Sequence, residues 1–186
     1  MKKLRTGQLV LDAMLAAMCA VLAYFSVTFG TNVKVTFESI PILIGSLLFG
    51  PVDGMLIGGV GTLLYQLLGS GYGITVTTPL WILPYVVAGG VTGWYAKRCG
   101  FELSRARTVG IVLLNELLIT LLNTGAIYAD SKIYGYYYPG IVLGVLALRL
   151  AICVARALIY AFVAPLLVKQ LKKTVRTGAG RQGEQT

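Results

Sequence analysis

The sequence predicts an all-α membrane protein, a bundle of six transmembrane helices with both termini in the cytoplasm. Its 186 residues are 56% hydrophobic and only 12% charged, and the mean hydropathy is +0.78. This composition is more apolar than that of an ordinary soluble domain. Several apolar runs are long enough to cross a bilayer, which takes roughly 20 helical residues. The basic residues are also gathered into a few short segments.

The distribution of these basic residues predicts the topology. Three of the sixteen Lys and Arg lie in residues 1–8, four in 97–107 and five in the tail from 169 onward. Cytoplasmic segments of membrane proteins are enriched in basic residues, so all three segments are expected inside. Lys34 and Lys132 fall in expected external loops. The net charge of +9 therefore gives no reason to expect nucleic-acid binding.

The predicted domain covers residues 1–173, followed by a flexible basic cytoplasmic tail over 174–186. Its spans, in chain order, are expected at about 9–28, 38–50, 52–68, 79–95, 108–128 and 140–168.

The first span contains two overlapping pairs of small residues four positions apart, Ala13/Ala17 and Ala16/Ala20. Small residues at this spacing allow another helix to approach closely in lipid. The approaching helix could belong to this bundle or to a separate membrane subunit. These four alanines are therefore candidate partner-docking residues.

The next segments alternate polar loops with apolar runs. The loop 30–39 contains Lys34 and Glu38, and alternation through Phe37 suggests an extended backbone. The run 40–50 is short for a span, and Gly50-Pro51 predicts a turn.

The third and fourth spans contain glycines that suggest close helix packing. Gly50, Gly54 and Gly58 recur every four residues, and Gly89 and Gly93 form a similar pair. The Gly-rich loop 69–78 lacks the lysine of a phosphate-binding P-loop. Trp81 beside prolines is a candidate stacking platform.

The last two spans place polar residues at membrane depth. From helix rise, Asn123 lies about 7 Å below the outer boundary, Arg149 about 13 Å, Glu116 about 18 Å and Arg156 about 24 Å. Intramembrane charge is costly, so Glu116 and Arg156 are expected to form a structural ion pair. Arg149 could pair with an acid from a loop, Glu38 or Asp130, or bind a ligand carboxylate through its two-pronged guanidinium group.

The residue inventory does not suggest an enzyme. The chain has no histidine and three scattered cysteines, so no metal site, cofactor or acid–base pair is predicted. A membrane enzyme is the weakest hypothesis.

Four features resemble the S components of energy-coupling factor (ECF) transporters, most closely the folate-type members. They are the basic start leading into Ala13-x-x-x-Ala17, the segment KVTFESIPILIGSLLFGP over 34–51, the segment TTPLWILPYVVAGGVTG over 77–93, and LLNT over 121–124 followed by Arg149. S components are small six-helix proteins of the bacterial cell membrane. They capture vitamins at the outer side.

The resemblance implies partners and roles for residues. Helix one would dock through its alanines on a transmembrane coupling subunit, which two ATPases drive, so this chain itself would hydrolyse nothing and membrane lipid would surround it. Residues 34–38 would lie in a gating loop. The candidate substrate-binding residues are Lys34, Phe37, Glu38, Gln66, Trp81, Tyr85, Asn123 and Arg149.

The resemblance to the folate-type members makes folate the preferred substrate, and a pterin stacked on Trp81 with a glutamate carboxylate on Arg149 would be chemically coherent. Pantothenate, thiamine or a pyrimidine precursor, and riboflavin are the alternatives within the class. A structural membrane protein without transport activity is a hypothesis from a different class, since glycine-rich packing faces and interfacial tyrosines fit it as well.

Overall fold

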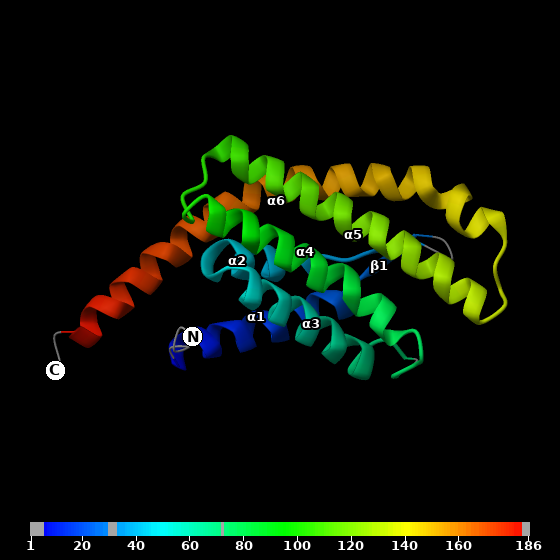
Figure 1. Ribbon diagram of the computed structural model, residues 1–186, viewed down its shortest axis with the longest axis horizontal. Coiled ribbons are helices and arrows are strands. Elements are labelled where there is room, and N and C mark those ends of the chain that lie inside the picture. Colours follow the sequence, from blue (N-terminus) through cyan, green and yellow to red (C-terminus); the bar gives the residue numbers. More distant parts are fainter. Residues whose placement is uncertain (1–5, 30–32, 72, 184–186) are drawn as a thin grey trace.

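The computed structural model describes residues 6–29, 33–71 and 73–183, without the side chains of 27–29, 33–34, 145 and 172–183. In these residues the chain forms a bundle of six helices and one short β-hairpin (Figure 1). The elements in order are α1 (Thr6–Tyr24), β1 (Val27–Phe29), β2 (Val33–Val35), α2 (Ser39–Phe49), α3 (Pro51–Leu68), α4 (Thr78–Arg98), α5 (Arg105–Ile133) and α6 (Pro139–Gly183).

The first predicted span, 9–28, is wrong at its end. Helix α1 stops at Tyr24, and 27–29 pair antiparallel with 33–35, with Thr28 opposite Lys34. The β-branched residues of both strands favour an extended backbone over a continued helix. The extended conformation expected through Phe37 ends at Val35, where β2 ends.

Helix α2 lies at the centre of the bundle and contacts all five other helices. It has 11 residues, and eight of them are buried, including Ile42, Leu43 and Leu47. At a rise of 1.5 Å per residue it is about 16 Å long, roughly half the thickness of a bilayer core. The run predicted as the second span is thus a core helix surrounded by protein.

The later helices are longer than predicted. Helix α5 starts three residues before the predicted span and continues to Ile133, through part of the expected external loop. Its first turn is capped by Ser104, whose Oγ accepts from the backbone N–H of Arg107 at 3.4 Å. Helix α6 continues past residue 168 to Gly183, so the segment expected to be a flexible tail from 174 is helical over 174–183.

The glycines predicted to pack closely bring the backbones of α3 and α4 into direct contact. A Cβ on Gly89 would lie 2.4 Å from the carbonyl oxygen of Gly54, and a Cβ on Gly93 would lie 2.4 Å from the carbonyl carbon of Gly50. Only glycine permits such an approach. Ser46 of α2 secures the contact, since its Oγ donates to the Gly89 carbonyl at 3.0 Å.

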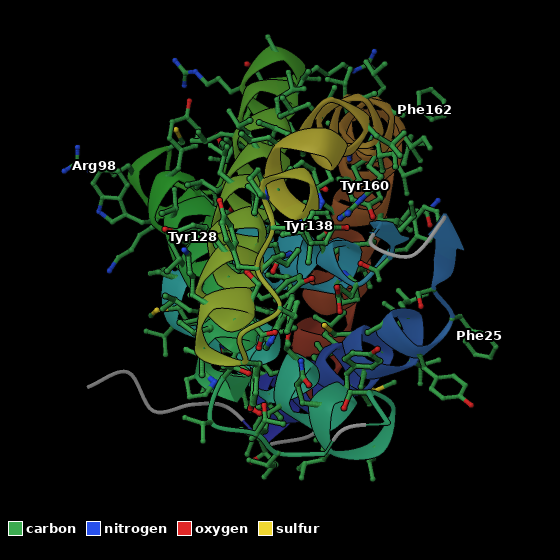
Figure 2. All side chains as sticks on the ribbon, turned by 90° about the vertical axis from the view of Figure 1, so that its right-hand side faces the viewer. Phe25, Arg98, Tyr128, Tyr138, Tyr160 and Phe162 are labelled. Atoms are coloured by element: carbon green, nitrogen blue, oxygen red, sulfur yellow. The ribbon has the colours of Figure 1, made fainter. Side chains whose placement is uncertain are left out.

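The bundle has two distinct ends. Helix α1 begins and α6 ends toward the left of Figure 1, the side on which the α4–α5 connection also lies, whereas the α3–α4 and α5–α6 connections lie at the right. Four helices of the described chain are long and apolar enough to cross a membrane: α1, α3, α5 and residues 139–171 of α6. Figure 2 shows Phe25 and Phe162 projecting outward and Tyr160 lying inside the bundle, in keeping with exposed fractions of 70%, 74% and 0%.

Candidate functional site: a polar cavity at one end of the bundle

A cavity of about 820 Å³ lies among α3, α4, α5 and α6, at the end where the α3–α4 and α5–α6 connections lie. Its lining combines apolar and aromatic surface with many side chains that can hydrogen-bond. The polar and aromatic lining residues are Thr36, Glu38, Thr62, Tyr65, Gln66, Ser70, Thr75, Thr77, Trp81, Tyr85, Thr120, Asn123, Asp130, Tyr134, Tyr136, Arg149 and Arg156. A concave, largely apolar pocket with a few convergent polar groups is the usual form of a small-molecule site.

The structure brings together six of the eight predicted substrate-binding residues. Those lining the cavity are Glu38, Gln66, Trp81, Tyr85, Asn123 and Arg149. Phe37 lies elsewhere, packed against the core around Leu43, with its ring centroid 6.4 Å from that of Tyr160. The backbone of Lys34 belongs to β2, and its side chain lies outside the described residues.

A hydrogen-bond network joins three elements at the inner end of the cavity. Thr36 Oγ1 donates to Glu38 Oε1 at 2.7 Å, and the Tyr85 hydroxyl donates to the same oxygen. Asn123 Nδ2 donates to the Tyr85 hydroxyl at 3.3 Å. The network links the segment before α2 with α4 and α5, so it fixes the position of the Glu38 carboxylate.

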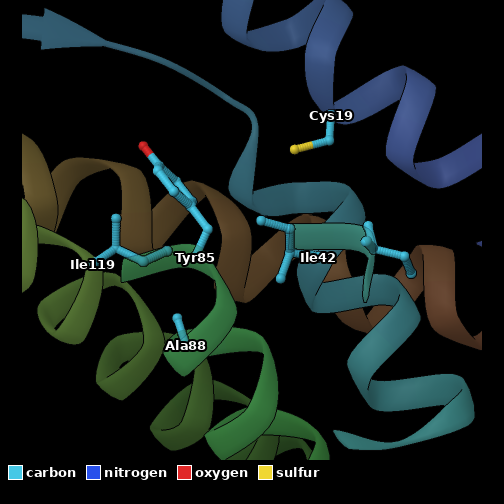
Figure 3. Close-up of a cluster of buried hydrophobic side chains, with 6 residues drawn as sticks. Cys19, Ile42, Tyr85, Ala88 and Ile119 are labelled. Carbon is cyan, nitrogen blue, oxygen red and sulfur yellow. The ribbon is translucent and has the colours of Figure 1, made fainter. Parts of the chain in front are cut away.

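Packing of the helices positions Tyr85 for this role. Figure 3 shows its ring in an apolar cluster with Cys19, Ile42, Ala88 and Ile119 and its hydroxyl pointing away from the cluster. Its backbone approaches α3 closely, because a Cβ on Gly58 would lie 2.7 Å from the Tyr85 carbonyl oxygen. The packed ring and the hydrogen-bonded hydroxyl together fix the position of this side chain.

The predicted Glu116–Arg156 pair is in contact. Arg156 Nη2 lies 2.7 Å from Glu116 Oε2 and donates to Ser39 Oγ at 2.9 Å. Glu116 has no exposed surface, and Arg156 is 11% exposed. Asn115 Nδ2 donates to Glu116 Oε1 at 3.3 Å, which fixes the carboxylate further. Arg156 also lines the cavity, so the ion pair forms part of its inner wall.

Side chains from the α3–α4 and α5–α6 connections surround the outer part of the cavity. Thr75 and Thr77 lie with their hydroxyl oxygens 3.1 Å apart. The Tyr136 hydroxyl donates to Asp130 Oδ2. Next to them, Lys132 Nζ lies 4.1 Å from the ring centroid of Tyr137, which packs edge-on against Tyr128. The tyrosine-rich segment thus forms an ordered rim.

Sequence reasoning missed several lining residues. Thr36, Thr62, Thr75 and Thr77 were not predicted because threonine is common in loops and helices and carries no positional signal of its own. Arg156 was assigned only to the ion pair, because a one-dimensional depth estimate does not show that its side chain also borders a cavity. Among the described residues, no group of three or more His, Cys, Asp or Glu side chains could hold a metal ion.

The four candidate docking alanines do not share one face of α1. Ala13 and Ala17 are exposed, whereas Ala16 is 4% exposed and Ala20 is half-buried. Ala16 faces α3, where a Cβ on Gly61 would lie 3.0 Å from the Ala16 carbonyl oxygen. The Ala13/Ala17 pair therefore lies on the outer surface, and Ala16 serves packing inside the bundle.

Comparison with known proteins identifies the family. The family model described as "ECF transporter, substrate-specific component" matches residues 7–175. The chain belongs to this family. ECF S components are substrate-binding subunits of transporters and not enzymes. Membership of this family indicates a multi-pass membrane protein. It also implies a small-molecule vitamin as substrate and an ECF module as partner. No curated protein matches the chain.

Solved S components share the fold. A FolT crystal structure bound with folic acid is 24% identical, with a TM-score of 0.62 over 85% of this chain and 89% of that chain. The S component for biotin from an ECF-type ABC transporter is 17% identical, with a TM-score of 0.72 over 93% of this chain and 94% of that chain. The S component of another bacterial ECF transporter is 17% identical, with a TM-score of 0.62 over 91% and 97%.

Proposed function

We propose that this S component captures a vitamin, folate by preference, in the cavity at the outer end of the bundle. The single observation that carries the proposal is the cavity itself, which is large enough for a drug-sized ligand and has Trp81 and Arg149 in one lining. Trp81 offers a flat surface on which an aromatic heterocycle can stack. Arg149 offers two parallel N–H donors to a carboxylate. A FolT structure that shares the fold contains folic acid, and this supports the preference.

The proposed topology has six membrane crossings with both termini on the cytoplasmic side of a bacterial cell membrane. Gly50 lies beside Phe101 of the α4–α5 connection, so the α2–α3 turn belongs to the end of the bundle opposite the cavity. The chain therefore passes between the ends six times, with α2 making one passage inside the protein. The basic segments 97–107 and 169–181 would lie inside.

Delivery would depend on a coupling subunit and two ATPase subunits, with ATP used by those partners and not by this chain. Helix α1 would dock through Ala13 and Ala17, which are small and exposed. We expect Ala13→Leu/Ala17→Leu to abolish co-purification with an ATPase-containing partner. The control Val10→Leu/Val21→Leu enlarges two exposed residues of the same helix and should retain the partner. Unchanged association of the alanine variant would count against docking through these two alanines.

Equilibrium binding to the purified protein tests the substrate. Folic acid should bind in the nanomolar range, and Arg149→Ala should weaken it by about 10- to 100-fold, the cost of losing a charge-assisted hydrogen bond. Arg105→Ala removes an exposed arginine at the other end of the bundle and should leave binding unchanged. Thiamine, pantothenate, riboflavin and pyrimidine precursors are tested in the same assay. Tighter binding of one of these would replace folate as the substrate, and folate binding unaffected by Arg149→Ala would remove that residue from the site.

A further inference from the structure

The inner end of the cavity presents hydrogen-bond acceptors. Glu38 is 4% exposed and lines the cavity. Both donors that reach it, from Thr36 and Tyr85, use Oε1. Its second oxygen, Oε2, accepts neither of these two hydrogen bonds. Asn123 uses its amide N–H on Tyr85, and its buried Oδ1 has no hydrogen-bond partner among the described residues.

Among the side chains that the structure describes, the charges at this end leave Glu38 without full compensation. Glu116 and Arg156 lie 2.7 Å apart and offset each other. Together with Glu38, the three side chains carry a formal charge of minus one. A buried carboxylate whose charge is not offset is costly unless hydrogen-bond donors reach it. Another carboxylate would be repelled here, whereas a ligand group rich in N–H donors would satisfy the site.

We propose that Glu38 is the specificity-determining residue of the cavity, and that it recognises a nitrogen heterocycle carrying an amino group beside a ring N–H. The 2-amino-4-oxo edge of a pterin has this arrangement, and two parallel N–H donors suit a carboxylate. Asn123 Oδ1 is a further acceptor at the same end. This inference rests on the proposed function, because it takes the cavity to be the vitamin site.

The arrangement also sets the orientation of the ligand. Arg149 precedes Arg156 by seven residues on α6, which is about 10 Å along the helix axis. Arg156 marks the inner end, through its contacts with Glu116 and with Ser39, the neighbour of Glu38. The amino-heterocycle therefore lies at the inner end, and an anionic group lies on the order of 10 Å farther out, at the level of Arg149.

A comparison of two ligands on two proteins tests the proposal by calorimetry. The ligands are folic acid and its 2-deamino analogue, which lacks only the exocyclic amino group. The unmodified protein should bind the analogue about 10- to 100-fold more weakly, as expected when a charge-assisted hydrogen bond is lost. Glu38→Gln should bind folic acid more weakly, and its discrimination between the two ligands should fall below about threefold, because one interaction cannot be lost twice.

Glu102→Gln is the matched control, since Glu102 is exposed on the α4–α5 connection and the charge change is the same. It should keep the full discrimination. Equal binding of the two ligands to the unmodified protein would overturn the proposal without relying on any variant, and so would full discrimination by a folded Glu38→Gln protein. If the unmodified protein binds no folic acid, the proposed substrate fails. If it binds folic acid but ignores the amino group, only the role of Glu38 fails.

Discussion

Neutralising one member of the Glu116–Arg156 pair should destabilise the bundle far more than replacing both. In Glu116→Gln, the guanidinium of Arg156 stays buried, with only 11% of the side chain exposed, and loses the carboxylate charge that offsets its own. Leaving one charge of a buried pair uncompensated costs about 3–5 kcal/mol. Replacing both charges by neutral side chains of similar volume is often close to neutral. We therefore expect the variant with both residues replaced to be about as stable as the unmodified protein. Each variant with one residue replaced should be much less stable.

Thermal unfolding of the purified protein in detergent without ligand measures this. For a chain of this size, 3–5 kcal/mol corresponds to a fall of about 6–20 °C in melting temperature. We expect such a fall for Glu116→Gln and for Arg156→Met, and a much smaller fall for the double variant. A double variant that is as unstable as the sum of the singles would refute the reasoning, because the two side chains would then act independently.

Two further predictions concern packing and the rim of the cavity. Gly89→Ala should lower the free energy of unfolding by about 1–3 kcal/mol, because the added methyl group would meet the Gly54 carbonyl. Gly125→Ala is the control: open space surrounds this glycine, so the change should raise the free energy of unfolding by up to about 1 kcal/mol. Equal effects of the two changes in thermal unfolding would contradict the close α3–α4 contact. Tyr136→Phe removes the hydrogen bond to Asp130 and should speed ligand dissociation severalfold in stopped-flow measurements, with a loss of about 1 kcal/mol in stability; an unchanged dissociation rate would show that the rim does not retain the ligand.

The elements that sequence predicted well have strong local signals. Helices α3, α4, α5 and α6 follow from apolar runs bounded by turns and charges, and the glycine face of α3 follows from its four-residue spacing. The contact between Glu116 and Arg156 was predictable because both charges needed a partner at similar membrane depth.

The features that sequence did not predict depend on tertiary structure. The end of α1 and the hairpin over 27–35 form where an apolar run could have continued as helix, and pairing between two strands overrides that pattern. The burial of α2 could not be predicted, because an apolar run looks the same whether lipid or protein surrounds it. Whether Ala16 faces the interior or the outside of the bundle could not be predicted either, because small residues pack equally well in both places.

Only part of the candidate site could be predicted from the sequence. Arg149 and Trp81 are conspicuous in an apolar sequence, so each could be singled out alone. The contact of Tyr85 with Glu38 joins residues 47 positions apart, and no local pattern relates them. The threonines of the lining are also invisible until the fold brings them to one cavity.

Native mass spectrometry of the purified protein, mixed with equal concentrations of folic acid, biotin, riboflavin, thiamine and pantothenate, tests the central claim most directly. The protein should retain one vitamin per chain, with the mass of folic acid, and Arg149→Ala should lose most of it. Retention of a different vitamin would correct the substrate. A folded protein that retains none of the five would contradict the claim that the cavity captures one of these vitamins.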